Sequence, residues 1–172
     1  GTYTVQYKVT KANYNDVTGS YQFSIANAPA SDLNVVADNI DVVYDGTAKT
    51  VEVTAIDGAT IEYSVDGGEW TAVAPVFTDA GEATVAYRVT KANYNDVTGE
   101  VAVKITKADM TVTADDIEKV YDGTAAGVVV NAPEGAAIEY SLNNADWTAV
   151  APVFTDVVDT TVYYRVTKAN YN

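Results

Sequence analysis

Hydrophobic and polar residues alternate along almost the whole chain with a period of two residues. Between residues 83 and 91, for example, Val85, Tyr87 and Val89 fall on one face, and threonine and arginine fall on the other. Successive side chains of a β-strand point to opposite faces of a sheet, so this period predicts half-buried strands. No stretch shows the apolar stripe that predicts an amphipathic helix. We therefore expect an all-β protein.

Turn-forming residues separate the alternating runs. The string Asp66-Gly67-Gly68 predicts a hairpin, because aspartate and glycine tolerate the positive φ of tight turns. Pro75 and Pro152 have no backbone N–H to donate to a sheet, so each predicts a short edge segment. The strands expected between residues 30 and 107 are Leu33–Ala37, Asp41–Tyr44, Thr50–Ala55, Thr60–Val65, Trp70–Val76, Ala83–Lys91 and Gly99–Thr106.

The pattern itself is repeated along the chain. The string Lys11–Gly19 recurs unchanged as Lys91–Gly99, and its first five residues return as Lys168–Asn172. When residues 30–95 are aligned with residues 107–172, 41 of the 66 pairs are identical. Self-similarity at this period predicts one folded unit that is copied in tandem.

We expect three parts in the chain. Residues 1–29 hold the last two strands of an incomplete repeat (Tyr3–Thr10 and Ser20–Ala26), residues 30–107 form a complete repeat, and residues 108–172 form a repeat without its final strand. Short strands with regular turns predict that each repeat is an immunoglobulin-like antiparallel β-sandwich. A β-grasp-like repeat stays open as the alternative, because alternation does not determine strand order. The joins are short, which predicts neighbours with restricted relative motion.

Charge and composition exclude several classes of function. The chain has 24 acidic and 10 basic residues, a net charge of −14, and neither cysteine nor histidine. A surface this acidic disfavours nucleic acid and anionic membranes as partners, because both are recognised by basic residues. Disulfides, thiolate nucleophiles and imidazole bases are absent. The carboxylates lie on turns and are copied from repeat to repeat, so we do not expect an enzyme.

No apolar run approaches the roughly 20 residues of a membrane-spanning helix, and no signal peptide opens the chain. Because the chain begins inside a repeat, we expect any targeting or anchoring segment to lie outside this sequence. The expected partners are neighbouring repeats of the same chain. An alternative is head-to-tail self-association, in which Tyr21–Ile25 of one molecule adds as a strand to the last repeat of another.

Four aromatic residues are candidates for binding a ligand. Tyr44 and Tyr121 stand in Tyr-Asp-Gly strings, and Trp70 and Trp147 follow the expected hairpin turn in two repeats. Exposed aromatic rings would stack on the sugars of a host glycan or mucin. The structural alternative is that the tyrosines pack at the sandwich edge and the tryptophans close the hairpin against the core.

Hard oxygen ligands raise a second hypothesis, a calcium ion that stiffens the joins. Asn93, Asn95 and Asp96 lie in the most closely repeated string, and Asp115 and Asp116 lie near the start of the last repeat. Amide and carboxylate oxygens are the ligands that Ca²⁺ prefers. Their spacing matches no strict calcium loop, so a solvated acidic surface is the competing interpretation.

Several strings resemble a known class of repeat. The strings Val43–Ala48, Glu62–Gly68, Phe77–Gly81 and Tyr87–Tyr94 have counterparts at Tyr121–Gly123, Glu139–Ser141, Phe154–Asp156 and Tyr164–Tyr171. In order and type they resemble the immunoglobulin-like, YDG/MBG-type repeats of bacterial cell-surface adhesins. The resemblance implies an extracellular protein on the bacterial surface, in which such repeats form a stalk or fibre or an adhesive surface.

Overall fold

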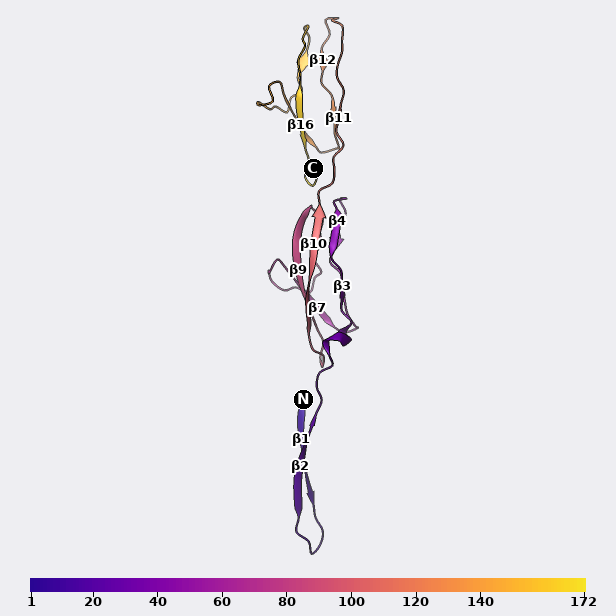
Figure 1. The fold of residues 1–172 in the computed structure, drawn as a ribbon, viewed down its shortest axis with the longest axis vertical. Helices are drawn as coiled ribbons and strands as arrows, with labels where there is room; N and C mark the ends of the chain where they lie inside the picture. Colours follow the sequence, from indigo (N-terminus) through magenta and orange to yellow (C-terminus); the bar gives the residue numbers. More distant parts are fainter. The chain divides into compact units, whose positions relative to one another are not determined.

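The structure is a computed structural model that describes all 172 residues. The prediction of an all-β protein is confirmed: the chain forms sixteen strands, and its only helical segment is the 3-10 helix η1, Ala30–Leu33 (Figure 1). No helix has the length and apolar character that crossing a bilayer requires. Below, residues 1–29, 30–107 and 108–172 are called the first, middle and third copies.

The chain forms two compact units whose boundary passes through the middle copy. The first unit comprises Gly1–Asn39, Thr50–Pro75 and Thr84–Ala102, and the second comprises Ile40–Lys49, Val76–Ala83 and Val103–Asn172. Neither unit therefore coincides with one copy of the sequence.

The first copy is a two-stranded hairpin within the first unit. Strands β1 (Thr2–Val9) and β2 (Val17–Ser24) pair antiparallel, with Val5 opposite Tyr21. The period of two places every large apolar side chain on one face. These side chains are between 40% and 64% exposed: Tyr3, Val5, Tyr7, Val9, Val17, Tyr21 and Phe23. The first copy therefore has the alternation of apolar and polar residues, but its apolar face is not buried.

The rest of the first unit contains a buried core. Strand β3 (Val36–Ala37) pairs with β6 (Val53–Thr54), and β7 (Thr60–Val65) pairs with β9 (Gly81–Thr90). The fully buried side chains are Leu33, Val51, Val85, Val89 and Val101. The alternation seen in the sequence directs these valines inward, and hydrophobic burial stabilises the fold.

A four-stranded sheet has the order β4-β10-β9-β7, with β4 at Ile40–Val43 and β10 at Val97–Thr106. Strands β5 (Lys49–Thr50) and β8 (Val76–Phe77) form a separate pair. This arrangement of several sheets is consistent with the predicted β-sandwich. Three pairings depart from the antiparallel prediction: β4 runs parallel to β10, and the isolated bridges Ala28–Tyr94 and Ala108–Tyr171 are also parallel.

Two expected strands of the middle copy are mostly absent. The stretch Leu33–Ala37 begins at the end of η1, and Asn34 follows in the left-handed region at φ 48°, so only Val36–Ala37 is a strand. Leu33 is buried while its carbonyl accepts a bond from the Ile56 amide at 3.0 Å, which holds this bend in place. The stretch 70–76 forms only an isolated bridge at Thr71 before β8 begins.

The third copy lacks counterparts of β4 and β10, and two of its strands are shorter than their counterparts in the middle copy. Its strands are β11 (Thr113–Ala114), β12 (Ala126–Gly127), β13 (Val130–Asn131), β14 (Ala137–Ser141), β15 (Val153–Phe154) and β16 (Tyr163–Thr167). Strand β9 has neighbours on both edges, whereas β16 pairs only with β14, and it has half the length of β9. The segment 117–120, which aligns with β4, forms no strand, since the third copy has no counterpart of β10.

Glycine is required where a tyrosine ring crosses the neighbouring strand. A Cβ atom at Gly99 would overlap the ring and hydroxyl of Tyr87, and one at Gly19 would overlap Tyr7. Neither glycine has a positive φ, so close approach of the ring is what excludes a side chain there. The same ring-over-glycine contact therefore occurs in the first and middle copies.

Candidate functional site

The Tyr-Asp-Gly string of the middle copy is a turn built around one carboxylate. Asp45 accepts hydrogen bonds from the backbone N–H of Thr47 at 2.8 Å and from its hydroxyl at 2.7 Å. The ammonium of Lys49 donates to the other carboxylate oxygen at 2.8 Å, and Gly46 supplies the positive φ of 77°. The Lys49 bond, followed by the Thr47 bonds, holds the pKa of Asp45 well below its ordinary value.

The third copy builds the same turn with a different lysine. Thr124 donates to Asp122 through its N–H at 2.9 Å and its hydroxyl at 2.7 Å. The cation is Lys119, which precedes the turn and lies 2.9 Å from the carboxylate. Its hydrogen bond is the main reason that the pKa of Asp122 is lowered. Both aspartates are thus occupied in stabilising their own turns.

The two tyrosines proposed as ligand platforms have different surroundings. Tyr44 is half-buried, and its ring lies edge-on to Tyr171 with 5.7 Å between centroids and 76° between planes. Tyr121 is 64% exposed. It lines a hollow of about 780 Å³ in the third copy that Asp115 and Asp116 also line. The structure therefore brings one proposed platform and two proposed metal ligands to a single surface depression.

Each tryptophan is the base of a stacked ion pair. The guanidinium of Arg88 lies 4.6 Å from the centre of the Trp70 ring and donates to Glu62 at 2.7 Å. Arg88 and Glu62 face each other across the β7–β9 ladder. Their hydrogen bond lowers the pKa of Glu62 and raises the pKa of Arg88. A cation over an aromatic face is attracted by the ring quadrupole, so the three side chains support one another.

The third copy repeats this group with the same dimensions. Arg165 lies 4.6 Å from the Trp147 ring and 2.6 Å from Glu139. Trp70 is 40% exposed and Trp147 is half-buried, so one part of each indole stays open to solvent. Both tryptophans could be predicted from the sequence as candidate site residues, whereas the arginine and the glutamate were not among the predicted residues. The sequence contains one signal for this arginine and glutamate: both residues occur in the middle and third copies, on the polar face of their strands.

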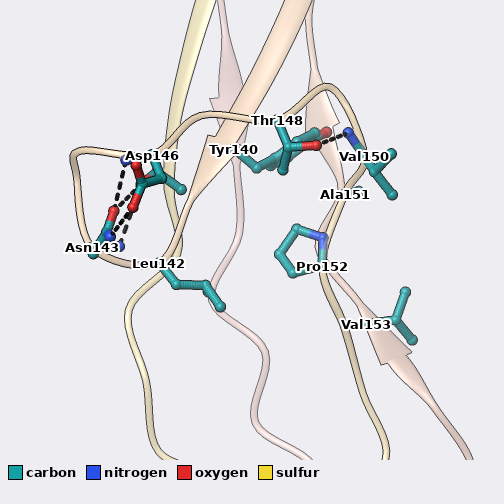
Figure 2. A pocket seen from close by; sticks show the side chains of 10 residues that line it. Tyr140, Leu142, Asn143, Asp146, Thr148, Val150, Ala151, Pro152 and Val153 are labelled. Atoms are coloured by element: carbon teal, nitrogen blue, oxygen red, sulfur yellow. Dashed lines mark hydrogen bonds between the residues drawn. The ribbon is translucent and has the colours of Figure 1, made fainter.

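A hollow of about 630 Å³ lies beside the hairpin turn of the third copy. Figure 2 shows the side chains of Tyr140, Leu142 and Pro152 around it, with hydrogen bonds between Asn143 and Asp146 at one side. The Asn143 amide donates to Asp146 at 2.8 Å. The β14–β16 ladder ends at Ser141, so Leu142 is left 55% exposed. Leu142 therefore lines the hollow as a residue just beyond the end of the ladder.

The residues of the calcium hypothesis have structural contacts in the middle copy. Asn93 has a φ of 68°, and its carbonyl accepts a bond from the Ala28 N–H at 2.9 Å. Asn95 donates its N–H to the Ala28 carbonyl at 3.0 Å, and the charge of Asp96 contributes to the raised pKa of Arg88. No group of three or more acidic side chains is placed to hold a metal ion. Asn93, Asn95 and Asp96 belong to the first compact unit, and Asp115 and Asp116 to the second.

Comparisons with known proteins were made by family and by sequence. No protein-family model matches the chain, and a search of curated proteins finds no significant match.

Proposed function

We propose that the chain is a structural stalk or adhesive repeat of an extracellular bacterial surface protein or fibre. In such a protein the work is mechanical: strand ladders carry tension, and the joins between copies limit bending. The strings that are repeated most closely are then expected to stabilise turns and joins rather than to form one unique pocket. The turns at Asp45 and Asp122 and the stacked groups at Trp70 and Trp147 have this character.

One observation carries the proposal: the segment that enters each of the last two copies is hydrogen-bonded, through both an N–H and a carbonyl, to a loop of the copy that it enters. Ala28 donates to the Asn93 carbonyl and accepts from the Asn95 amide. Ala108 likewise donates to the Asn170 carbonyl at 3.0 Å and accepts from the Asn172 amide at 2.9 Å. These bonds fix each entering segment to a loop of the copy that it enters, which shortens the stretch that can act as a flexible linker. In a stalk, tension that reaches the entering segment would pass into the following copy partly through these backbone bonds.

The charge of the chain also suits a stalk. A net charge of −14 is spread over 172 residues. Charges of one sign repel each other, which keeps neighbouring molecules apart on a crowded surface and opposes bending back of the same chain. The effect decays over about 8 Å at physiological ionic strength, so it acts between surfaces that nearly touch.

Small-angle scattering of lengthened chains tests the proposal. One or two further copies of residues 28–107 are inserted after Lys107, which repeats the natural join. A stalk predicts that the maximum dimension rises by a constant increment with each copy. Flexible beads would instead increase in average dimension with about the square root of copy number. Growth of that kind, or a compact particle, would refute the proposal.

A second candidate is a module that binds a host glycan or mucin. It is favoured by the partly open face of Trp70, because indole rings are common platforms for flat ligands. Glycan-array binding of the wild-type chain, compared with Trp70→Ala and Trp147→Ala variants, tests this candidate. Binding that survives both substitutions would exclude the tryptophans as the platform.

A further inference from the structure

The string Lys-Ala-Asn-Tyr forms the same loop in all three copies. We call these the Asn-Tyr loops: Lys11–Tyr14, Lys91–Tyr94 and Lys168–Tyr171. The asparagines have φ values of 66°, 68° and 67°, and in every loop the lysine ammonium lies over the tyrosine ring. A positive φ explains why asparagine or glycine stands there. It does not explain why the carboxamide is retained.

The carboxamide of the third loop has two partners outside its own copy. The Oδ1 atom of Asn170 accepts a hydrogen bond from the Ala80 N–H at 2.9 Å. Its Nδ2 group donates to the Asp79 carboxylate, also at 2.9 Å. Asp79 and Ala80 form the turn between β8 and β9 of the middle copy, and all three residues belong to the second compact unit. One amide group thus satisfies a donor and an acceptor on one turn.

The tyrosine of the same loop makes a second contact. The Tyr171 ring meets Tyr44 of the middle copy edge to face, and the Lys168 ammonium lies 4.8 Å from the centre of the Tyr171 ring. Tyr44 is itself fixed, because its N–H donates to the Thr106 carbonyl at 2.8 Å. Aromatic pairs in this geometry are attractive beyond the area that they bury. Tyr44 therefore contacts the next copy, which accounts for its partial burial.

We propose that the Asn-Tyr loop is a clasp that recognises the preceding repeat. Its partner is a turn that offers a carboxylate beside a free backbone N–H, together with the tyrosine of a Tyr-Asp-Gly turn. The clasp deepens the stalk proposed above and rests on it. The same loop also holds the entering segment at Ala108, so one loop links the joining segment, its own copy and the preceding copy. The direct bond from Asn170 to Asp79 performs the stiffening that the calcium hypothesis assigned to an ion.

The third copy presents the counterpart surface. Asp156 and Val157 align with Asp79 and Ala80, and Tyr121 aligns with Tyr44. Tyr121 is 64% exposed, whereas Tyr44 is half-buried against Tyr171. This surface fits the Asn-Tyr loop of another repeat of the same class, which would cover Tyr121 as Tyr171 covers Tyr44.

Substitution of asparagine by glycine isolates the clasp. Asn170→Gly keeps the positive φ and removes only the carboxamide. Asn93→Gly is the matched control, because Asn93 has the same φ and the same backbone bonds but no side-chain hydrogen bond. Amide hydrogen exchange is followed by NMR at Ala80, whose N–H belongs to the neighbouring copy. Loss of one hydrogen bond predicts exchange about fivefold faster in Asn170→Gly and unchanged in Asn93→Gly.

A double-mutant cycle between Asn170→Gly and Asp79→Ala completes the test. Unfolding of the second compact unit is followed by Trp147 fluorescence in a Trp70→Phe background, and the loss of stability in the double variant should be smaller than the sum of the two single losses. Equal Ala80 exchange in the two glycine variants, or additive effects in the cycle, would overturn the clasp. The stalk would survive that result if scattering still showed constant increments per copy. If the maximum dimension did not rise by a constant increment, while the double-mutant cycle still showed coupling between Asn170 and Asp79, the stalk would be overturned and the clasp would remain.

Discussion

Each of the three copies has a valine at the same position of a repeated string, and the three valines have very different surroundings. Val9, Val89 and Val166 occupy the same place in the repeated string Val-Thr-Lys-Ala-Asn-Tyr-Asn. Val9 is 59% exposed, Val89 is fully buried, and Val166 is half-buried. Replacement of each by alanine removes the same atoms from three environments. The series therefore measures burial with the local sequence held constant.

The expected cost at Val89 follows from its burial. Replacement of valine by alanine removes the equivalent of two buried CH₂ groups, which costs about 1.6 kcal/mol in transfer free energy. A residual cavity of about 40 Å³ adds roughly 1 kcal/mol. The variant Val89→Ala should therefore lose about 2–3 kcal/mol of unfolding free energy. At Val9 only the strand preference of valine is lost, which is worth less than about 1 kcal/mol, and Val166→Ala should fall between the two.

Urea unfolding followed by tryptophan fluorescence measures these differences. In a Trp147→Phe background Trp70 reports on the first compact unit, which contains Val9 and Val89. In a Trp70→Phe background Trp147 reports on the second unit, which contains Val166. Midpoints are converted to free energies with a common slope. Equal losses for Val9→Ala and Val89→Ala would refute the reasoning, because they would mean that the face of the first copy is buried in solution.

Three further predictions concern the turn, the ring-over-glycine contact and the stacked ion pair. The folded-state pKa of Asp45 is lowered, so the stabilisation by its carboxylate is fully present above the unfolded pKa of 3.8. The difference in unfolding free energy between wild type and Asp45→Asn should therefore be constant above that pH and decrease as the pH falls below it. Urea unfolding at each pH measures this difference. The variant Gly99→Ala should lose about 1–2 kcal/mol in the same assay, because the new methyl group displaces Tyr87; an unchanged midpoint would contradict this. Removal of the guanidinium by Arg88→Ala should increase acrylamide quenching of Trp70 in the Trp147→Phe background, whereas unchanged quenching would show that the ring is not covered.

Strand type could be predicted from the sequence, but strand length could not. Within the identical strings Tyr87–Asn95 and Tyr164–Asn172, β9 and β16 end at equivalent residues, but β9 starts at Gly81 and has ten residues, whereas β16 starts only at Tyr163 and has five. The difference lies in the preceding segments 81–85 and 158–162, which differ in sequence, and β10 pairs with β9 but has no counterpart beside β16. Local propensity indicates only that a segment is able to form a strand, and pairing with a partner strand determines how many of its residues do so. The bend after Leu33 was missed for a related reason, since the burial of that side chain is a tertiary effect.

The candidate residues were predictable as types but not as contacts. Tryptophan at 70 and 147 was an obvious choice, whereas Arg88 and Glu62 looked like ordinary polar residues on the outer face of a sheet. Their pairing depends on the β7–β9 register. The alternation does not determine this register, because a shift of two residues keeps the same side chains on the same face. Tyr44 and Tyr121 stand in the same string and differ in burial because Tyr171 comes from the next copy.

The Asn-Tyr loops show how two constraints act on one residue. Backbone geometry alone would accept glycine at 13, 93 and 170, since glycine adopts a positive φ without steric cost. Asparagine stands at all three positions, and at Asn170 a second constraint acts on the side chain. The carboxamide is a short group that accepts and donates at the same time. The turn at Asp79 and Ala80 demands both, because it offers a carboxylate next to an N–H. Aspartate would repel the carboxylate and glycine would leave both groups without this partner, so asparagine alone meets the two constraints together.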